Sequence, residues 1–184
     1  MRNFDSPHFE QVLTYWQSIA LETAPRVSEF DLIQIPSALP DITLWEMHPD
    51  GRVVCRMSGT AVIARMKSDI TGVEISQVMP PKAGINIVDD VQAILAQPCA
   101  LYQLVLNRHV TGKIARMESL IMPLAADAGG MPRFVSVNHM IETVRYDSDE
   151  HTGELELMRS LEERTFLDLG WGVPDVENFN QQIS

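Results

Sequence analysis

The chain has 184 residues, of which 45% are hydrophobic, and it carries 14 basic and 25 acidic residues, a formal net charge of −11. This length suits one domain, or one domain with a modest extension, and the apolar content excludes wholesale disorder. Nucleic acids and anionic membrane surfaces are excluded as partners. Both are bound through clusters of Lys and Arg, and the sequence contains no basic stripe.

The negative charge is unevenly distributed along the chain. Residues 1–140 hold 11 basic and 14 acidic residues, a net charge of −3, whereas residues 141–184 hold three basic and 11 acidic residues, a net charge of −8. No apolar run approaches the ~20 residues of a membrane span, and the first residues lack the apolar core of a secretory signal. Cys55 and Cys99 do not have the number or spacing of a disulfide framework. We therefore expect a cytoplasmic protein with an acidic C-terminal extension.

The N-terminal segment has the pattern of an amphipathic helix. Ser6-Pro7 is a typical helix start, and the apolar residues that follow recur at three- and four-residue spacing, which predicts a helix from about residue 7 to residue 23 that Pro25 ends. Its apolar stripe either packs on the protein's own core or forms a dimer contact, and one helix can do both. A proline-containing connector then extends to Pro40.

The central part of the sequence alternates strand and helix patterns. His48-Pro49-Asp50-Gly51 is a turn between two apolar runs, which predicts a β-hairpin over residues 42–63. A helix is predicted over residues 84–97, and Pro98 ends it. Three further strands are predicted over residues 100–107, 114–124 and 133–141. Strands at both ends with helices between them favour an α+β domain, in which a five-stranded antiparallel sheet carries helices on one face.

The acidic extension contains one further predicted element. Residues 154–169 place Leu155, Met158, Leu161 and Phe166 on one helical face, and Gly170 to Pro174 end the segment. The sequence leaves two interpretations open. The segment is either an output element that binds a partner or an acidic cap that packs on its own domain.

Several short motifs, taken in order, resemble the PAS domain family, and more narrowly the single-domain PAS proteins of alphaproteobacteria. The resemblance covers roughly residues 9–141. It divides the chain into an N-terminal helix with its connector (1–40), a PAS-like core (41–141) and the acidic extension (142–184). The motifs are Tyr15-Trp16, Pro25-Arg26, Ile35-Pro36, Leu39-Pro40, Arg56 to Thr60, Asp69 to Gly72, and Met122 to Ala125 before the Asp127–Gly130 turn.

The resemblance implies a PAS-like sheet and short helices that enclose a small cavity. It further implies sensing or partner binding without a reaction of its own, and a homodimer through the N-terminal helix, with candidate interface residues Phe9, Val12, Trp16 and Ile19. No histidine kinase, cyclase or DNA-binding segment follows residue 141. We therefore expect the output to pass to a separate signalling protein.

The PAS family includes sensors that bind haem or a flavin, and the sequence bears on each. A haem sensor of the common type takes its ligand from the helix before the third strand, and residues 84–97 contain no His. Flavin photosensors carry an Asn-Cys-Arg-Phe-Leu-Gln type segment, which this chain lacks. The five histidines form no close pair that would bind a metal. His109 and His139 are each expected to be single, hydrogen-bonded side chains. We expect no cofactor and no metal.

A cavity between the sheet and the helices is the remaining candidate site. Its expected apolar lining is Cys55, Met57, Ile87, Val91, Met117 and Val137. If the strands turn their other face inward, polar recognition would come from Arg56, Arg116, Glu118 and Asn138, because periodicity alone does not fix the register. A pocket of this composition favours an apolar ligand.

Two alternatives to a ligand-binding sensor remain. If the side chains fill one another, the chain is a ligand-free dimerisation or adaptor domain. A small enzyme or carrier would use the same cavity, although the sequence shows no nucleophile with its base and no paired carboxylates.

Overall fold

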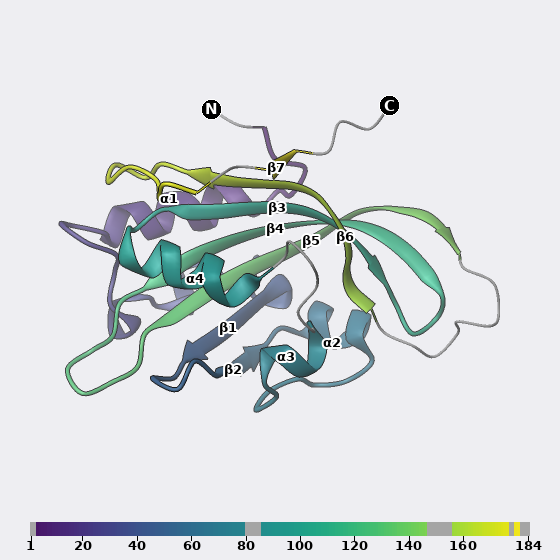
Figure 1. The fold of residues 1–184 in the computed structure, drawn as a ribbon, viewed down its shortest axis with the longest axis horizontal. Helices are drawn as coiled ribbons and strands as arrows, with labels where there is room; N and C mark the ends of the chain where they lie inside the picture. The colour runs from purple at the N-terminus through teal and green to yellow at the C-terminus, as the bar shows by residue number, and fades with distance from the viewer. Residues whose placement is uncertain (1–2, 80–85, 147–155, 177–178, 181–184) are drawn as a thin grey trace.

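The computed structural model describes residues 3–79, 86–146, 156–176 and 179–180. Its strands form a single curved sheet (Figure 1). The helices are α1 (Phe9–Ile19), α2 (Thr60–Met66), α3 (Ile75–Val78) and α4 (Ile87–Ala96), with three short 3-10 turns between Val27 and Asp41. The strands are β1 (Ile42–Met47), β2 (Val53–Ser58), β3 (Ala100–Arg108), β4 (Lys113–Leu124), β5 (Arg133–Tyr146), β6 (Glu156–Leu167) and β7 (Phe179–Asn180).

The strands form one antiparallel sheet in the order β2-β1-β5-β4-β3-β6-β7. The first five strands are those predicted from the sequence, and β1 has the predicted bounds. The predicted α+β fold, with a PAS-like antiparallel sheet, is therefore confirmed. Beyond it, β6 and the two-residue β7 continue the sheet past β3.

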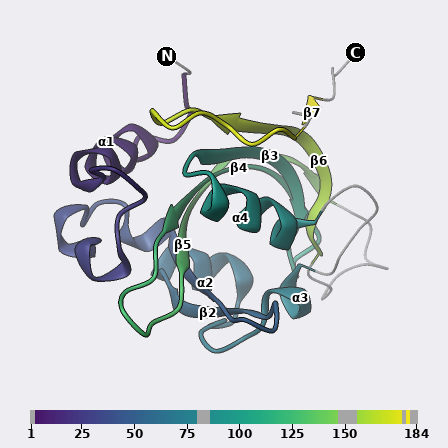
Figure 2. The same cartoon turned by 60° about the vertical axis from the view of Figure 1, so that its left-hand side comes forward.

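The two faces of the sheet are covered differently. Figure 2 shows α4 inside the curve of the sheet and α1 outside it. Side chains of α2, α3 and α4 pack with Trp45, Leu101, Ile121 and Phe134 on the inner face, which we call the pocket face. Side chains of α1 pack with Leu120, Met122, Val135 and Val137 on the opposite, outer face. Each face therefore has its own hydrophobic core.

The apolar stripe of α1 packs on the chain's own sheet. Phe9, Val12 and Trp16 are completely buried within the chain, and Ile19 is half-buried against the same cluster. The Trp16 indole Nε1 donates a hydrogen bond of 2.8 Å to the carbonyl oxygen of Pro123 in β4. Of the four candidate dimer residues, only Ile19 keeps exposed surface.

Two predicted elements are wrong. The second strand was expected to reach Ile63, but β2 ends at Ser58 and α2 begins at Thr60. Gly59 lies so close to the 3-10 turn before β1 that a Cβ would meet the carbonyl oxygen of Leu39 at 2.3 Å, and the chain changes direction there.

The predicted helix of the extension is the strand β6, which pairs along β3 from Ala100 to Arg108. Residues 154 and 155 of that predicted helix, and residues 84 and 85 of the predicted helix 84–97, lie outside the described residues. Without β6, the backbone N–H and C=O groups along one edge of β3 would lack partners. This pairing between distant segments outweighs the local helical periodicity of the extension, so the segment forms a strand.

Candidate ligand pocket

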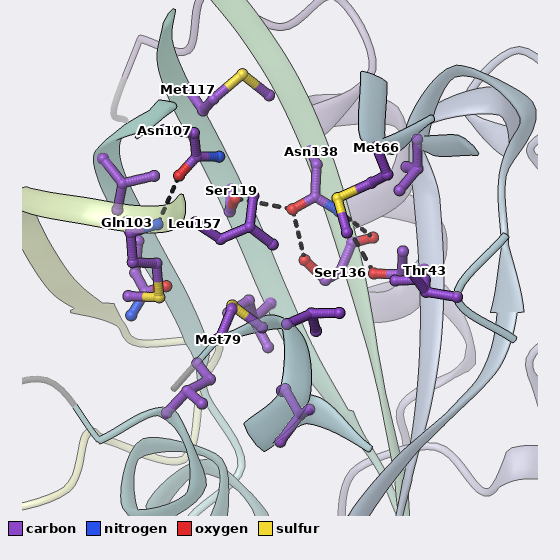
Figure 3. Close-up of a pocket in the computed structure, with 18 of the residues that line it drawn as sticks. Thr43, Met66, Met79, Gln103, Asn107, Met117, Ser119, Ser136, Asn138 and Leu157 are labelled. Carbon is purple, nitrogen blue, oxygen red and sulfur yellow. Dashed lines mark hydrogen bonds between the residues drawn. The ribbon is translucent and has the colours of Figure 1, made fainter. Parts of the chain in front are cut away.

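A cavity of about 90 Å³ lies between the pocket face of the sheet and the helices α2 to α4 (Figure 3). One water needs a cavity of only about 10–15 Å³, so this cavity can hold a compact organic molecule. The sheet contributes most of its wall: Thr43, Trp45, Gln103, Val105, Asn107, Met117, Ser119, Ile121, Phe134, Ser136, Asn138, Leu157 and Met158, with His109 just beyond β3. The helices and their flanking residues contribute Val62, Arg65, Met66, Ile70, Ile75, Val78, Met79 and Ile87.

The alternation of side chains along each strand explains this selection. Successive residues of a strand point to opposite faces, so every second residue meets the cavity. On β3 the cavity-lining residues are Gln103, Val105 and Asn107, and on β4 they are Met117, Ser119 and Ile121. Of the intervening residues, Leu104 and Leu120 pack in the outer-face cluster and Glu118 is buried.

Polar side chains form a row across the middle of the pocket face. Asn138 on β5 lies directly opposite Ser119 on β4, and Ser119 lies directly opposite Gln103 on β3. The Asn138 Oδ1 accepts hydrogen bonds from the hydroxyls of Ser119 at 2.9 Å and Ser136 at 3.1 Å. Its Nδ2 lies 3.4 Å from the hydroxyl oxygen of Thr43, and Figure 3 shows Asn138 between these three side chains. We call Asn138, Ser119 and Gln103 the polar row.

Two buried nitrogens at the pocket have no hydrogen-bond partner among the described residues: Gln103 Nε2 and His109 Nε2. Gln103 is 3% exposed and His109 is 4% exposed. Leaving a buried polar group unpaired costs about 1–3 kcal/mol. The pocket wall therefore contains polar groups that could gain from a further partner.

The His109 ring is held as the neutral imidazole. Its Nδ1 lies 3.2 Å from the carbonyl oxygen of Arg65, which can only accept, so Nδ1 carries the proton. Burial lowers the pKa of His109, the nearby charges of Lys113 and Arg65 lower it further, and the hydrogen bond to the Arg65 carbonyl acts in the opposite direction. The unpaired Nε2 is consequently a hydrogen-bond acceptor.

The only permanent cation among the described lining residues is already neutralised. Arg65 Nη1 lies 2.7 Å from Asp41 Oδ1, and Arg65 Nη2 donates at 2.9 Å to the carbonyl oxygen of Asn138. With His109 neutral, the described part of the wall offers no unpaired charge to a ligand.

The C-terminal strand β6 forms part of the pocket wall. Leu157 and Met158 both line the cavity. The backbone N–H of Met158 donates to Asn107 Oδ1 at 2.7 Å, and Met158 adopts a φ of 49°, which is uncommon for a residue other than glycine. The β3–β6 register shifts at this point, between Leu106 and Arg108, and again between Leu104 and Val105. Pocket and extension therefore meet at Asn107 and Met158.

The structure brings some of the predicted pocket residues together and separates others. Ile87 and Met117 line the cavity. Cys55 and Val91 are completely buried in the hydrophobic cluster beside it but are not among the lining residues. Met57 and Val137 pack instead in the outer-face cluster, Val137 because it alternates with the pocket-lining Ser136 and Asn138.

The charged residues suggested for recognition lie away from the pocket. Arg56 forms a 2.8 Å ion pair with Glu46, and Arg116 pairs with Glu142 and, at 2.9 Å, with Glu162. Burial acts to raise the pKa of Glu46, but hydrogen bonds from Arg56 and Arg133 outweigh it and hold that pKa below its usual value. These arginines therefore connect strands to one another.

Glu118 is completely buried on the outer face. Its carboxylate accepts hydrogen bonds from the backbone N–H of Ser6 and, at 3.1 Å, from the Tyr102 hydroxyl. It thereby ties the segment before α1 to the sheet. Of the four polar candidates, only Asn138 lines the cavity.

The acidic extension pairs with basic residues of its own domain. Glu162 meets Arg116 on β4, and Glu156 Oε2 lies 3.5 Å from Arg108 Nη2 on β3. The extension also supplies a basic partner: Arg164 Nη1 of β6 lies 3.2 Å from Oδ1 of the buried Asp90 in α4. Part of the extension's charge is therefore neutralised within the fold.

Sequence analysis missed most of the pocket lining, including five uncharged polar side chains: Thr43, Gln103, Asn107, Ser119 and Ser136. A signal for them existed on β3, where Gln103 and Asn107 lie four apart in a strand that is otherwise rich in apolar residues. Such spacing places both on one face of a strand. Without the β3–β4 and β4–β5 registers, however, it does not show that this face meets a cavity.

The described parts of the chain lack a metal-binding cluster and a reactive thiol. They contain no cluster of three or more His, Cys, Asp or Glu side chains that could bind a metal. Burial raises the pKa of the Cys55 thiol to about 11 and that of Cys99 to about 12, so both remain protonated and unreactive. Within the same residues, no helix combines the length and the apolar character needed to cross a bilayer.

Comparison with known proteins identifies the family of the chain. No curated protein matches the sequence. A family model described as a PAS domain matches residues 4–138, which span α1, the five strands β1 to β5 except the end of β5, and the helices that cover the pocket face. The match includes the sheet-borne pocket wall up to Asn138. The chain therefore belongs to the PAS domain family, whose members are sensory and regulatory modules.

Proposed function

We propose that this protein is a sensory module that binds a small molecule in its internal pocket and signals by contact with a separate protein. The observation that carries the proposal is the cavity of about 90 Å³ whose wall combines apolar side chains with the polar row. A cavity left by imperfect packing is expected to be apolar and dry. A few convergent polar groups in an apolar pocket are instead typical of ligand sites.

The extension is the element we propose to carry the signal. Leu157 and Met158 of β6 line the pocket, and Asn107 joins the pocket to β6 through the Met158 N–H. A ligand in the pocket would contact β6 itself. Binding can shift the docking of β6 only if the ligand interacts differently with the docked and undocked states, and a direct contact supplies that difference.

Ligand retention tests this function. The purified full chain would be incubated with the small-molecule fraction of a cell extract, washed and weighed by native mass spectrometry. We expect wild type to retain a small molecule. Ser119→Phe, which fills the pocket, should lose it, whereas Ser18→Phe on the exposed side of α1 should keep it. A wild-type mass equal to that of the bare chain would reject ligand binding and favour the ligand-free dimerisation or adaptor domain.

The proposal includes no catalytic step and no coloured cofactor. No described pocket residue combines a nucleophile with a hydrogen-bonded base, and the described lining has one histidine, His109. Purified protein should therefore show no absorption band above the aromatic region. A visible band that survives desalting would revive haem or flavin and overturn this part of the proposal.

A further inference from the structure

We infer that the ligand of this pocket is an uncharged molecule with an apolar body and a hydrogen-bond acceptor, such as a carbonyl oxygen, that meets the Gln103 amide. The inference rests on the proposed function and specifies the chemistry of the ligand. It follows from the arrangement of three features around the cavity: two apolar regions, the polar row between them, and the absence of unpaired charge from the described wall.

The apolar regions lie on either side of the polar row. On one side, Val105, Met117 and Met158 belong to a small cluster that also contains Leu161. On the other side, Ile87, Ile121 and Phe134 belong to the main cluster of the pocket face. Apolar area buried against these side chains would provide most of the binding free energy. The methionines adapt their shape to the ligand body.

The polar row sets the position of the ligand's polar group. Within the row, Asn138 Oδ1 already accepts from Ser119 and Ser136, so this end is satisfied. Gln103, directly opposite Ser119, has an amide nitrogen with no partner among the described residues. An acceptor on the ligand would satisfy this N–H, and an all-apolar ligand would leave it unpaired. A carbonyl or a similar acceptor is therefore preferred over a hydrocarbon.

Charge balance excludes an ionised ligand. Arg65 is paired with Asp41, and the neutral His109 offers only a lone pair at Nε2. A carboxylate in this pocket would lose its hydration without gaining a counter-charge among the described residues, and such a transfer is strongly unfavourable. We therefore expect discrimination between molecules of one shape that differ only in the polar group.

Three probes of nearly identical shape test the inference: acetophenone, which carries a carbonyl; isopropylbenzene, which has a methyl group in its place; and benzoate, which is charged. Each would be titrated into the full chain while the methyl resonances of the pocket residues Met66 and Met117 are followed by NMR. We expect the Kd of acetophenone to be about fivefold lower than that of isopropylbenzene, the effect of one neutral hydrogen bond. Benzoate should give no saturable shift.

A variant assigns the preference to Gln103. Gln103→Leu should raise the Kd of acetophenone to that of isopropylbenzene and leave isopropylbenzene binding equal or tighter. The matched control Gln17→Leu, on the exposed side of α1, should bind all three probes like wild type. If Gln103→Leu does not fold, Gln103→Met removes the amide with an unbranched side chain of similar length and should reduce the preference in the same way.

The outcomes separate this inference from the proposed function. Equal or tighter binding of isopropylbenzene or benzoate by wild type would overturn the ligand class while leaving a functional pocket. A preference for acetophenone that survives in Gln103→Leu would overturn the role of the amide. If no probe shifts the pocket methyl resonances, the ligand class fails, and the proposed function fails with it only if wild type also retains no small molecule from the extract.

Discussion

The indole ring of Trp171 packs edge-on against the indole ring of Trp16, with ring centroids 5.9 Å apart and planes at 86°. Trp171 Nε1 also donates at 2.9 Å to the carbonyl oxygen of Glu22, just beyond α1. The segment that follows β6 is thus attached to α1, on the outer face. Both ends of β6 are consequently fixed, one at the pocket and one at the N-terminal helix.

Removal of this aromatic contact should destabilise the fold measurably. We expect Trp171→Ala to lower the free energy of unfolding by about 1–2 kcal/mol, because an aromatic pair contributes roughly 0.5–1.5 kcal/mol and one hydrogen bond is lost as well. Urea unfolding followed by far-ultraviolet circular dichroism measures the change. Val173→Ala, in the same segment but 39% exposed, serves as the control and should change stability little. Equal effects of the two variants would contradict the proposed attachment.

The hydrogen bond between Asn107 and Met158 should hold the first half of β6 in place. Asn107→Ala removes the acceptor of the Met158 N–H, and we expect faster amide hydrogen exchange in residues 156–161 than in wild type. Residues 163–167, which pair with β3 beyond the register shift, should exchange as before. Unchanged exchange in residues 156–161 would show that the Asn107 side chain does not hold this strand.

Gly59 should tolerate no side chain. Its backbone lies against the Leu39 and Pro40 carbonyls, so that a Cβ would approach their oxygen atoms to 2.3 and 2.4 Å. Because these are backbone atoms, we expect Gly59→Ala to cost about 3 kcal/mol through displacement of α2 from the turn before β1. Gly130→Ala is the matched control, since its Cβ would meet its nearest neighbour at 3.4 Å. Thermal unfolding of the two variants should differ clearly.

Burial of His109 predicts a stability that declines in mild acid. The pKa of His109 in the folded state is lowered below the unfolded value of about 6.5, so the unfolded chain binds more protons as the pH falls through that value. Stability is therefore fully present above the unfolded pKa and is lost as the pH decreases towards the folded pKa. Between pH 7 and pH 5, His109→Gln should lose less stability than wild type in urea titrations. Parallel losses would show that His109 does not contribute.

Dimerisation through α1, which the family resemblance implies, would have to use the exposed side of the helix. Phe9, Val12 and Trp16 are buried in the monomer, so Trp16→Glu would test folding rather than association. Thr14→Lys combined with Gln17→Lys places like charges on the exposed side, and light scattering should show the mass of a dimer reduced to that of a monomer. Asp50→Lys, in the β1–β2 turn, should leave the mass unchanged. A mass that the α1 changes do not alter rejects this interface.

Local patterns predicted the parts of the fold that depend on local interactions. The turn His48–Gly51 and its flanking apolar runs located β1, and the glycines between Asp127 and Gly130 located the β4–β5 turn. The start of α2 was missed because it depends on Gly59 meeting the distant Leu39. The extension was predicted as a helix because its partner, the edge of β3, is some 60 residues away in the sequence. Leu157 did not fit that helical stripe, and it lines the pocket as part of the strand.

In the candidate site, too, local patterns identified some residues and failed for those whose position depends on strand pairing. Hydrophobic periodicity identified Ile87 and Met117, which line the cavity. It failed for Val137 and Met57 because the face on which a strand residue lies depends on register, and a shift of one residue reverses every side chain. The polar row is a property of three strands together, since Asn138, Ser119 and Gln103 become neighbours only through two cross-strand pairings.

The pairing of β6 with β3 also covers an apolar strand edge. In β3, Leu101 and Val105 point to the pocket face and Tyr102 and Leu104 to the outer face, so that an uncovered β3 would offer a long apolar strand with free backbone donors and acceptors. Exposed edges of this kind recruit strands from other molecules. A change that released β6 would therefore uncover an apolar strand whose backbone groups are open to pairing with another strand.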